Sequence, residues 1–386
     1  MLAPLNKNGY LCGVSKKICV MKRVLHVTSS LRKNGTETFI MNVFRGIDRS
    51  KVMFDFLLLE QVDDGYEQEA RELGARLYYY PSRRKGLSNY RRVLKDFFKE
   101  HGQDYDAVHL SATSFTEVYP LSVAKDSGIK TRIIHSHSTS TGGLHNKLLH
   151  HLNKKRLHKV ANVFLACSRG AKDWGYGETR NFEKSEVIPN GIELSKYAFD
   201  SEKRKEFREE NGISDSIFVV THSGAFRHVK NHPFLIDVFA EIVNIRPDSL
   251  LLLCGDGESR AEIEVKVREK GLSDKVKFLG IRSDVDRILS ASDAYVFPSF
   301  YEGLPFALVE AQASGIDTYV SDKVSDEVKL SDNFKFLSLE QTPRVWALEI
   351  LKSTEHGRTA GNSPRLKDYD IATTCTRLMQ IYTNKE

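Results

Sequence analysis

The sequence has no long apolar run. The stretch FDFLLL at residues 54–59 is far too short to cross a membrane, so integral insertion is not expected. The first twenty residues contain lysines but no sustained apolar stretch, so they do not form a secretory signal peptide. We expect residues 1–20 to be a flexible extension.

Cysteine is scarce and is not arranged for disulfides or metal binding. The five cysteines are odd in number and lack metal-ligand spacing, which fits a reduced cytosolic compartment better than a disulfide framework. Cys167 and Cys254 each end an apolar stretch and are predicted to be inert core residues.

The chain also has little excess charge. Its net charge of +6 and isoelectric point near 8.8 favour an anionic partner without identifying it. Neither a basic stripe interleaved with aromatic residues nor a recognition helix is present, so no nucleic acid partner is expected. A hydrophobic content of 40% and a charged content of 28% are typical of a soluble globular protein. A length of 386 residues suits two domains.

Apolar strands alternate with amphipathic helical stretches along most of the chain. This alternation is typical of an α/β fold in which parallel sheets are wound with helices. Strands are predicted at residues 23–28, 53–59, 76–80, 106–110, 131–135, 162–166, 217–224, 249–254, 275–279, 294–297 and 317–320.

Two Rossmann-like domains follow from the restart of this pattern near residue 217. Residues 21–195 form the first domain and residues 196–365 the second, because a Pro-Asn-Gly turn and then a charged run separate them. Residues 366–386 are predicted to be a C-terminal helix. No linker rich in Pro, Gly or Ser joins the halves, so they should face each other across a cleft. Ligands of such sheets bind beyond the carboxyl ends of the strands.

The most informative feature that is present is a pair of glutamates with seven residues between them. Glu302 and Glu310 stand in FPSFYEGLPFALVEAQASG, where an apolar strand ends and a helix begins. Pro305 suits the first helical position, and the free amides of residues 303–306 with the helix dipole favour a diphosphate. This predicted donor-binding segment consists of Gly303, Leu304, Pro305 and Phe306.

The two carboxylates beside this segment indicate that the ligand has another chemical group besides the diphosphate. They are poor ligands for phosphate but good acceptors for sugar hydroxyls, so the ligand should carry both a phosphate and a sugar. The alternative is a solvated loop glutamate and a helix-surface glutamate, as most glutamates are.

The whole phrase resembles the motif of two glutamates separated by seven residues in the retaining glycosyltransferases of family 4. These group 1 transferases have the two-domain GT-B architecture, in which the C-terminal helix crosses back onto the first domain. The resemblance implies that Glu310 holds the ribose of a nucleotide-sugar and that Glu302 faces the transferred sugar. It covers about residues 22–385, and two further phrases are similar to bacterial exopolysaccharide and capsular polysaccharide members.

A loop after the first strand is a candidate for a second phosphate-facing segment. Gly35 and Thr36 follow Asn34, and residues 36–38 offer amides at a helix start. The alternative is a plain Asn-Gly turn. The resembled family usually has two glycines, a small residue and a glutamate here; this chain keeps Gly35 and Glu37 but has Asn at position 34.

Two histidines follow the strand at residues 131–135. His135 and His137 have no carboxylate or cysteine companions, which makes a metal pair a poor interpretation; two solvated loop histidines are another alternative. In the resembled family a histidine here contacts the donor sugar near the reacting carbon. His137 matches it more closely by position, and His135 is the second candidate.

Two cations follow the first strand of the second domain. Lys230 and Arg227 suit the negative charge that develops on a diphosphate leaving group, although a basic loop in solvent is an open alternative. The family pattern is Gly-Arg, four residues, Lys. Lys230 matches it, but Ala225 stands at the arginine position, so Arg227 is expected to reach back and replace that arginine.

Two further strand ends complete the predicted donor site. Gly255 and Gly257 allow close backbone approach, and by the family arrangement Ile281 or Arg282 meets the base. Neither signal is specific alone, because turns from strand to helix through glycine are common in α/β folds.

A basic helix is predicted at residues 144–160. Leu144, Leu148, Leu152 and Val160 recur at roughly helical spacing with basic residues between them. Such a helix suits an anionic lipid surface and a lipid-linked acceptor. The alternative is an ordinary helix that packs its leucines on the sheet.

These observations predict a cytoplasmic retaining hexosyltransferase of the GT-B type, with peripheral contact with the inner face of the membrane left open. Its donor is a nucleotide-diphosphate sugar, best a UDP-sugar, and its acceptor a glycan or lipid-linked oligosaccharide of bacterial surface polysaccharide. No cofactor and no metal are expected, because Asp284 and Asp286 fall where a helix starts. The alternatives are a non-catalytic nucleotide-sugar-binding subunit, prompted by Ala225, and a GT-B-like UDP-sugar epimerase.

Overall fold

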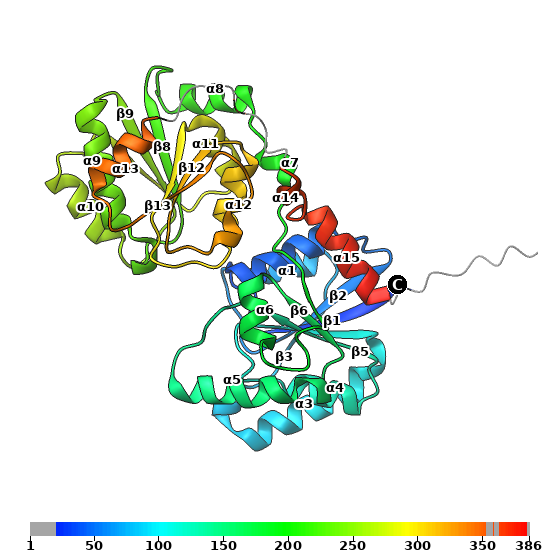
Figure 1. Cartoon of the computed structure of the whole chain (residues 1–386). Helices are drawn as coiled ribbons and strands as arrows, with labels where there is room; N and C mark the ends of the chain where they lie inside the picture. The colour runs from blue at the N-terminus through cyan, green and yellow to red at the C-terminus, as the bar shows by residue number, and fades with distance from the viewer. Residues whose placement is uncertain (1–20, 353–357, 359–362, 384–386) are drawn as a thin grey trace, which may run out of the picture.

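The computed structural model describes residues 21–352, 358 and 363–383. The predicted extension at residues 1–20, with Cys12 and Cys19, lies outside these residues. Figure 1 shows two lobes, each a sheet covered by helices on both faces. The chain passes from one lobe to the other near α7 and returns near α14.

The first lobe is built on a seven-stranded sheet with the order β3-β2-β1-β4-β5-β6-β7, and its strand pairs are parallel. β1 pairs with β2 in register from Lys22 opposite Val52 to Thr28 opposite Leu58. The strands are β1 (Lys22–Thr28), β2 (Val52–Leu58), β3 (Leu77–Tyr79), β4 (Ala107–Ala112), β5 (Thr131–Ser136), β6 (Val163–Ala166) and β7 (Ser185–Val187).

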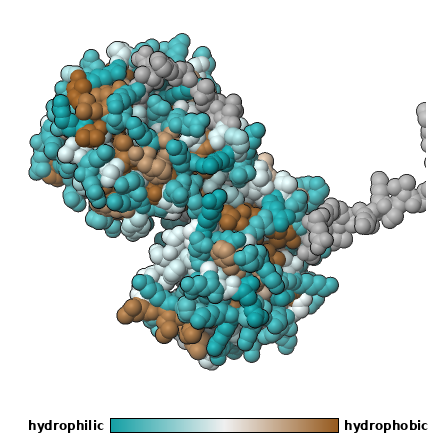
Figure 2. All heavy atoms as spheres, in the orientation of Figure 1, coloured by the Kyte–Doolittle hydropathy of each residue, from teal (hydrophilic) through white to brown (hydrophobic). Residues whose placement is uncertain are grey.

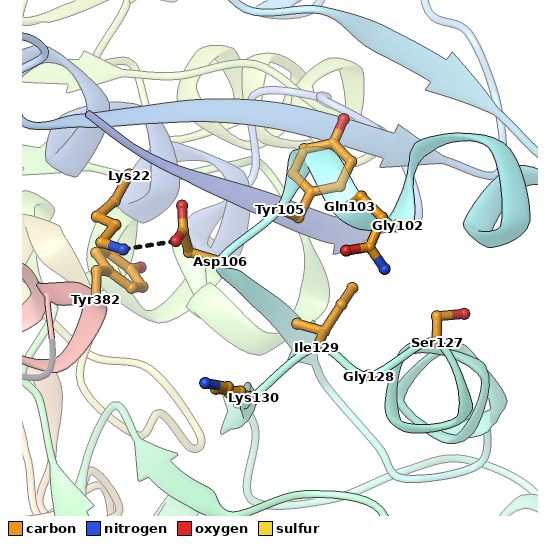
Figure 3. A pocket seen from close by; sticks show the side chains of 10 residues that line it. All are labelled: Lys22, Gly102, Gln103, Tyr105, Asp106, Ser127, Gly128, Ile129, Lys130 and Tyr382. Carbon is orange, nitrogen blue, oxygen red and sulfur yellow. Dashed lines mark hydrogen bonds and ion pairs between the residues drawn. The ribbon is translucent and has the colours of Figure 1, made fainter. Parts of the chain in front are cut away.

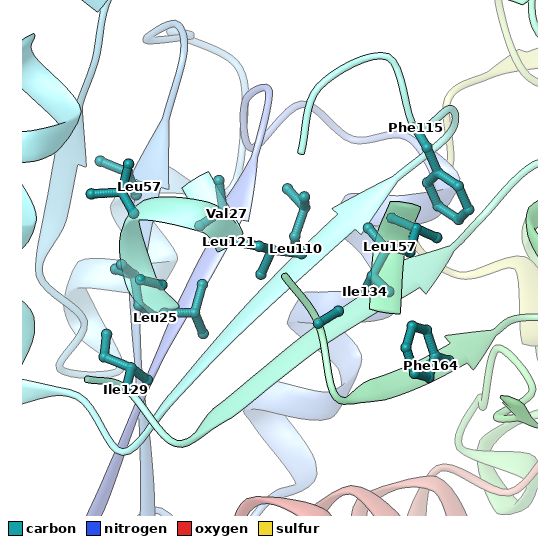
Figure 4. Close-up of a cluster of buried hydrophobic side chains, with 14 of the residues drawn as sticks. Leu25, Val27, Leu57, Leu110, Phe115, Leu121, Ile129, Ile134, Leu157 and Phe164 are labelled. Atoms are coloured by element: carbon teal, nitrogen blue, oxygen red, sulfur yellow. The ribbon is translucent and has the colours of Figure 1, made fainter. Parts of the chain in front are cut away.

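Buried apolar side chains hold the helices on this sheet. One cluster, drawn in Figure 4, joins strand residues such as Leu25 and Leu110 to helical residues such as Leu121. Burial of such side chains is the main stabilising contribution to the fold. The helices are α1 (Gly35–Gly46), α2 (Glu67–Glu72), α3 (Leu87–His101), α4 (Tyr119–Asp126), α5 (Leu144–Arg156) and α6 (Arg169–Tyr176).

The second lobe is built on a six-stranded sheet with the order β10-β9-β8-β11-β12-β13. Its strands are β8 (Phe218–Ser223), β9 (Ser249–Cys254), β10 (Val276–Gly280), β11 (Ala294–Phe297), β12 (Asp317–Ser321) and β13 (Phe334–Leu337). β13 was not predicted, because it has only four residues, one of them the exposed Lys335, and it pairs only with β12 at the edge of the sheet. The predicted α/β fold of two parallel-sheet domains is otherwise confirmed.

The remaining helices surround this second sheet or connect the lobes, except for α15, which packs on the first lobe. They are α7 (Leu194–Tyr197), α8 (Ser201–Glu210), α9 (His232–Ile245), α10 (Arg260–Glu269), α11 (Val285–Ala291), α12 (Phe306–Ala313), α13 (Pro343–Ile350), α14 (Pro364–Lys367) and α15 (Ile371–Thr383). No helix within the described residues has the length and apolar character needed to span a bilayer.

Helix α15 packs on the first lobe although it ends the chain (Figure 1). The Tyr382 hydroxyl lies 2.7 Å from His109 Nδ1, and Cys375 Sγ lies 3.6 Å from the Val43 carbonyl oxygen. Cys167, Cys254 and Cys375 are free and buried, as predicted for the first two.

One helix start differs from the sequence prediction. Pro305 is the residue before α12 rather than its first residue, because its ψ of 138° is extended and only Phe306 takes up the helical conformation. The shift leaves the free amides of the helix start at the same place.

Candidate active site

A cleft of about 850 Å³ lies between the two lobes. Figure 2 shows the indentation that separates them. Its walls come from the loops that follow β1, β4, β5, β6 and β7 in the first lobe and β8 and β11 in the second. Carboxyl ends of parallel strands are where such sheets bind ligands. The predicted site residues that line it are Gly35, Thr36, His137, Arg227, Lys230, Glu302, Gly303, Leu304, Pro305 and Phe306.

An ion pair lies at the centre of the second lobe's wall. Lys230 Nζ is 2.7 Å from Glu302 Oε1, and the same ammonium lies 4.5 Å from the centre of the Phe297 ring. Gly224 makes room for this lysine, since a Cβ there would lie only 3.2 Å from Lys230 Cε.

The second predicted cation has no such partner. The Arg227 side chain is exposed in the cleft, and it makes no hydrogen bond or ion pair with the described residues. Ala225, which stands where the resembled family has arginine, lines the same wall. Arg227 and Ala225 thus line the same wall of the cleft, and the Arg227 guanidinium is not engaged by another described side chain.

The start of α12 supplies the neutral part of the same wall. Glycine at 303 and the extended Pro305 leave the amides of Gly303, Leu304 and Phe306 without an acceptor among the described residues. Unpaired amides at a helix start, with the helix dipole behind them, bind anions.

The glycines after β9 approach protein backbone rather than the cleft. A Cβ on Gly255 would lie 2.0 Å from the Gly224 carbonyl oxygen, and one on Gly257 would lie 2.7 Å from the Phe226 carbonyl oxygen. Neither glycine lines the cleft. Instead of approaching a ligand, as predicted, their backbone packs against the loop that carries Arg227. The sequence could not distinguish these two uses of glycine.

His137 is the histidine that faces the cleft. Burial lowers its pKa to about 3, so the imidazole is neutral, and neither ring nitrogen has a hydrogen-bond partner in the described part of the chain. A neutral imidazole offers one donor and one acceptor, which suits a sugar hydroxyl.

His135 lies behind it, in the core of the first lobe. Its side chain is fully buried, its ring is 4.1 Å from that of His137, and its Nδ1 is 3.2 Å from His109 Nε2. Its ring contacts Phe39 of α1, and His109 links it to Tyr382 of α15, so His135 lies on the sheet face covered by these two helices. His135 does not line the cleft, so its buried position excludes it as the histidine that contacts a sugar.

The loop after β1 brings a carboxyl group as well as amides. Glu37 lines the cleft beside Gly35 and Thr36, and its carboxyl lies 3.3 Å from the Thr28 hydroxyl. Burial raises the pKa of Glu37, and its hydrogen bonds oppose that shift. A carboxyl group here is available to an acceptor hydroxyl.

Glu310 and its neighbours form a separate cluster near the end of β9. The Tyr197 hydroxyl lies 3.0 Å from Glu310 Oε1. Burial raises the pKa of the Cys254 thiol, at the end of β9, to about 12. Ile281 is 84% exposed. Glu310, Ile281 and Arg282 do not line the cleft. The Arg282 guanidinium is paired with the Asp284 carboxylate at 2.6 Å.

Polar residues of the first lobe were missed by the sequence analysis. Each of them follows a strand end, so the rule that ligands bind at carboxyl ends would have indicated them once the strands were known. They are Ser29, Thr113, Ser138, Thr139, Ser168 and Asn190.

A second hollow, of about 320 Å³, lies at the opposite end of the first sheet (Figure 3). It is bordered by Lys22, at the start of β1, and by Asp106, just before β4, which are paired at 2.7 Å. This position at the amino ends of the strands, with Lys22 and Asp106 paired with each other, favours the interdomain cleft as the functional site.

No group of three or more metal-ligand side chains is found in the described residues. Asp284 and Asp286 are engaged elsewhere: the first precedes α11 and pairs with Arg282, and the second pairs with Lys203 at 2.7 Å.

Comparison with known proteins agrees with this geometry. The model of Glycosyltransferase Family 4 matches residues 33–196, and that of Glycosyl transferases group 1 matches residues 203–337. The chain is 36% identical over 346 residues to the Bacillus subtilis protein named as glycosyltransferase EpsF, across 87% of this chain and 89% of that protein.

Two further proteins are similar over part or all of the chain. The UDP-Gal:alpha-D-GlcNAc-diphosphoundecaprenol alpha-1,3-galactosyltransferase of Escherichia coli is 32% identical over 160 residues, or 41% of each chain. The crystal structure of Anabaena HepE in complex with UDP superposes with a TM-score of 0.76 at 18% identity, covering 94% of this chain and 100% of that one. The predicted GT-B architecture is confirmed.

Proposed function

The chain belongs to the family 4, group 1 glycosyltransferases, and we propose that it transfers a hexose from a UDP-sugar, with retention, to a lipid-linked or glycan acceptor. The observation that supports this most strongly is the meeting of Lys230, Glu302 and the free amides before α12 on one wall of the cleft. HepE, which shares the fold, was solved with UDP, and the relative from Escherichia coli is named for UDP-Gal and a diphosphoundecaprenol acceptor. The product belongs to bacterial surface polysaccharide.

The cations and amides of the second lobe stabilise the leaving group in this proposal. The bond between the sugar carbon and the β-phosphate oxygen breaks, and negative charge grows on that oxygen. Lys230, released from Glu302, and Arg227 face this charge together with the α12 amides, and such fixed donors act without metal. Glu302 is then free to accept hydrogen bonds from the transferred sugar.

The acceptor attacks on the face from which the diphosphate leaves. Its hydroxyl oxygen forms the new bond to the sugar carbon, and its proton passes to the departing phosphate oxygen, so no covalent intermediate on the protein is required. His137 holds a sugar hydroxyl from the first lobe, because its neutral ring has both nitrogens unpaired among the described residues.

Incubation of the purified protein with UDP-, GDP- and ADP-sugars, with and without a glycan or lipid-diphosphate acceptor, tests the function. We expect release of free UDP from one UDP-sugar, with transfer dependent on the acceptor. Conversion of one UDP-sugar into another without acceptor would instead indicate an epimerase. UDP binding without turnover would indicate a binding subunit, and failure to bind any nucleotide would contradict the proposal.

Helix α5 supports a lipid-linked acceptor. Leu144, Leu148 and Leu152 are 86%, 59% and 43% exposed, so these leucines do not pack on the sheet as the alternative interpretation required. Figure 2 shows apolar atoms gathered on the lower edge of the first lobe, where Figure 1 places α5. His150, stacked between Phe115 and Trp174, holds the opposite face of the helix.

Basic residues flank this exposed leucine row. Lys147, Lys155 and Arg156 are exposed on the same helix. Leucines with adjacent cations suit the interface of an anionic bilayer, where the apolar groups enter and the cations meet lipid headgroups. We propose that α5 rests on the membrane that carries the acceptor.

Replacing Leu144, Leu148 and Leu152 together by serine is expected to lower binding to vesicles containing anionic phosphatidylglycerol by more than tenfold, since about 1.5 kcal/mol or more is lost per buried leucine. Vesicle co-sedimentation measures this, with neutral phosphatidylcholine vesicles for comparison. Leu87, a half-exposed leucine at the start of α3, provides the matched control when replaced by serine. Equal binding of the triple variant and the wild type would contradict a membrane role.

A further inference from the structure

We propose that Tyr197 positions Glu310 for the ribose of the donor and thereby sets the preference for a ribonucleotide over a 2′-deoxyribonucleotide. The inference rests on the function proposed above, in which Glu310 holds the ribose hydroxyls. Tyr197 is the last residue of α7, in the segment that connects the two sheets. Nothing in its local sequence indicates such a role.

The contact itself is a single hydrogen bond to the carboxylate. The Tyr197 hydroxyl donates to Glu310 Oε1 at 3.0 Å, and no other hydrogen-bond donor to this carboxylate is found in the part of the chain that the structure describes. A carboxylate accepts about four hydrogen bonds. One acceptor position is therefore taken by the tyrosine, and the others remain for two ribose hydroxyls.

The tyrosine ring is held firmly enough to direct the carboxylate. It packs against an apolar cluster that includes Val309 and Leu330, and Lys196 Nζ lies 5.6 Å from its ring centre. Helix α7 also packs against α11 and α12, the helix that carries Glu310. The hydroxyl is thus a fixed point, and Glu310 is oriented by it before a ligand arrives.

The charges around the pair favour the same arrangement. Burial, and then the negative charge of Glu310, raise the pKa of Tyr197, so its hydroxyl keeps the proton that it donates. Burial also raises the pKa of Glu310, whereas the Tyr197 hydrogen bond and the charge of Lys196 lower it and that of Asp286 raises it. Without the tyrosine hydroxyl, less would oppose the rise in the pKa of Glu310 that burial causes, and Glu310 would be a poorer hydrogen-bond acceptor.

This arrangement affects the two ribose hydroxyls together. A carboxylate fixed by Tyr197 presents its remaining lone pairs in one direction, so both hydroxyls gain from the same ordered group. Removal of the 2′-hydroxyl loses one of the two bonds. Removal of the tyrosine hydroxyl loosens both, and the advantage of a ribonucleotide over its 2′-deoxy form should shrink.

Calorimetric titration of the full chain with UDP and with 2′-deoxy-UDP tests the inference. We expect the wild type to bind UDP about tenfold more tightly than 2′-deoxy-UDP, and Glu310→Gln to lose most of that preference. Tyr197→Phe should bind UDP about five- to tenfold more weakly and 2′-deoxy-UDP only about two- to threefold more weakly than the wild type does, because the deoxy form has one ribose bond to lose instead of two. Its preference therefore falls toward unity.

A second tyrosine of the same apolar cluster serves as the control. Tyr369 packs there and makes no side-chain hydrogen bond to Glu310, so Tyr369→Phe should keep the wild-type preference. Thermal melting of each variant checks folding, and a purely structural effect would weaken both nucleotides alike.

The outcomes separate this inference from the function on which it depends. Equal weakening of both nucleotides in Tyr197→Phe, or no weakening, overturns the role of Tyr197. An unchanged preference in Glu310→Gln overturns the assignment of Glu310 to ribose and the role of Tyr197 with it. Failure of the wild type to bind UDP contradicts the proposed function itself.

Discussion

Lys230→Met is expected to lower kcat for sugar transfer by about 10²- to 10³-fold, the usual effect of removing one preorganised donor from a developing anion. Methionine is an unbranched apolar side chain that lacks the ammonium lying 4.5 Å from the Phe297 ring centre, so the loss reports the missing charge. Release of UDP at saturating donor and acceptor measures it. A kcat within about threefold of the wild type would show that Lys230 does not face the leaving group.

Lys230→Met should also raise KM for the donor, because removal of the lysine leaves the Glu302 carboxylate unpaired beside the diphosphate. Comparing Lys230→Met with the double variant Lys230→Met/Glu302→Gln separates the two contributions. If the repulsion matters, KM for the donor recovers in the double variant while kcat stays low. The same KM in both variants would mean that Glu302 does not approach the diphosphate.

Arg227 provides the matched comparison on the same wall of the cleft. It is exposed and unpaired among the described residues, so Arg227→Met should lower kcat less than Lys230→Met does. An arginine introduced by Ala225→Arg into the Arg227→Met protein should restore activity, because the charge returns to the position that the resembled family uses. No recovery would show that Arg227 does not replace that arginine.

Acidification is expected to unfold the protein at only mildly acidic pH, because burial strongly lowers the pKa values of six histidines, which are therefore neutral in the fold. The pKa of His26 and that of His137 are lowered to about 3, and that of His232 to about 4. Burial lowers the pKa values of the others further below the usual range. The six residues are His26, His109, His135, His137, His222 and His232.

The direction of the effect follows from proton binding. Between about pH 6.5 and pH 4 the unfolded chain binds protons on these histidines and the folded chain does not, so stability is present above pH 6.5 and is lost as pH falls. Each histidine contributes up to about 1.4 kcal/mol per pH unit to this slope. Glu37 and Glu310, whose pKa values burial raises, act in the opposite direction but are fewer.

Urea denaturation between pH 7.5 and pH 5 measures this slope. His26→Leu should reduce it by about 1.4 kcal/mol per pH unit, since both nitrogens of His26 lack partners in the described structure and leucine removes its proton uptake. His158→Leu, which changes an exposed histidine, is the control. A stability that stays constant from pH 7.5 to pH 5 would contradict neutral burial of the histidine group.

Local patterns made much of the fold predictable. Each predicted strand is a run of apolar residues with a recognisable turn beyond it, and each was found within a few residues of its expected bounds. The phrase from Glu302 to Glu310 was equally local, because a strand, a glycine, a proline and a helix follow in immediate succession. The roles given to these residues stay predictions, although the structure brings most of them to one cleft.

The sequence by itself therefore determined the two parallel sheets, the helix start that borders the cleft and the family, because these depend on residues that are neighbours in the chain. Only the tertiary structure decided that His137 rather than His135 faces the cleft, and that Gly255 approaches the Gly224 loop. It also decided that Tyr197 holds Glu310 across 113 positions of sequence. These choices depend on contacts between distant segments, and spacing along the chain carries no information about which distant group a side chain meets.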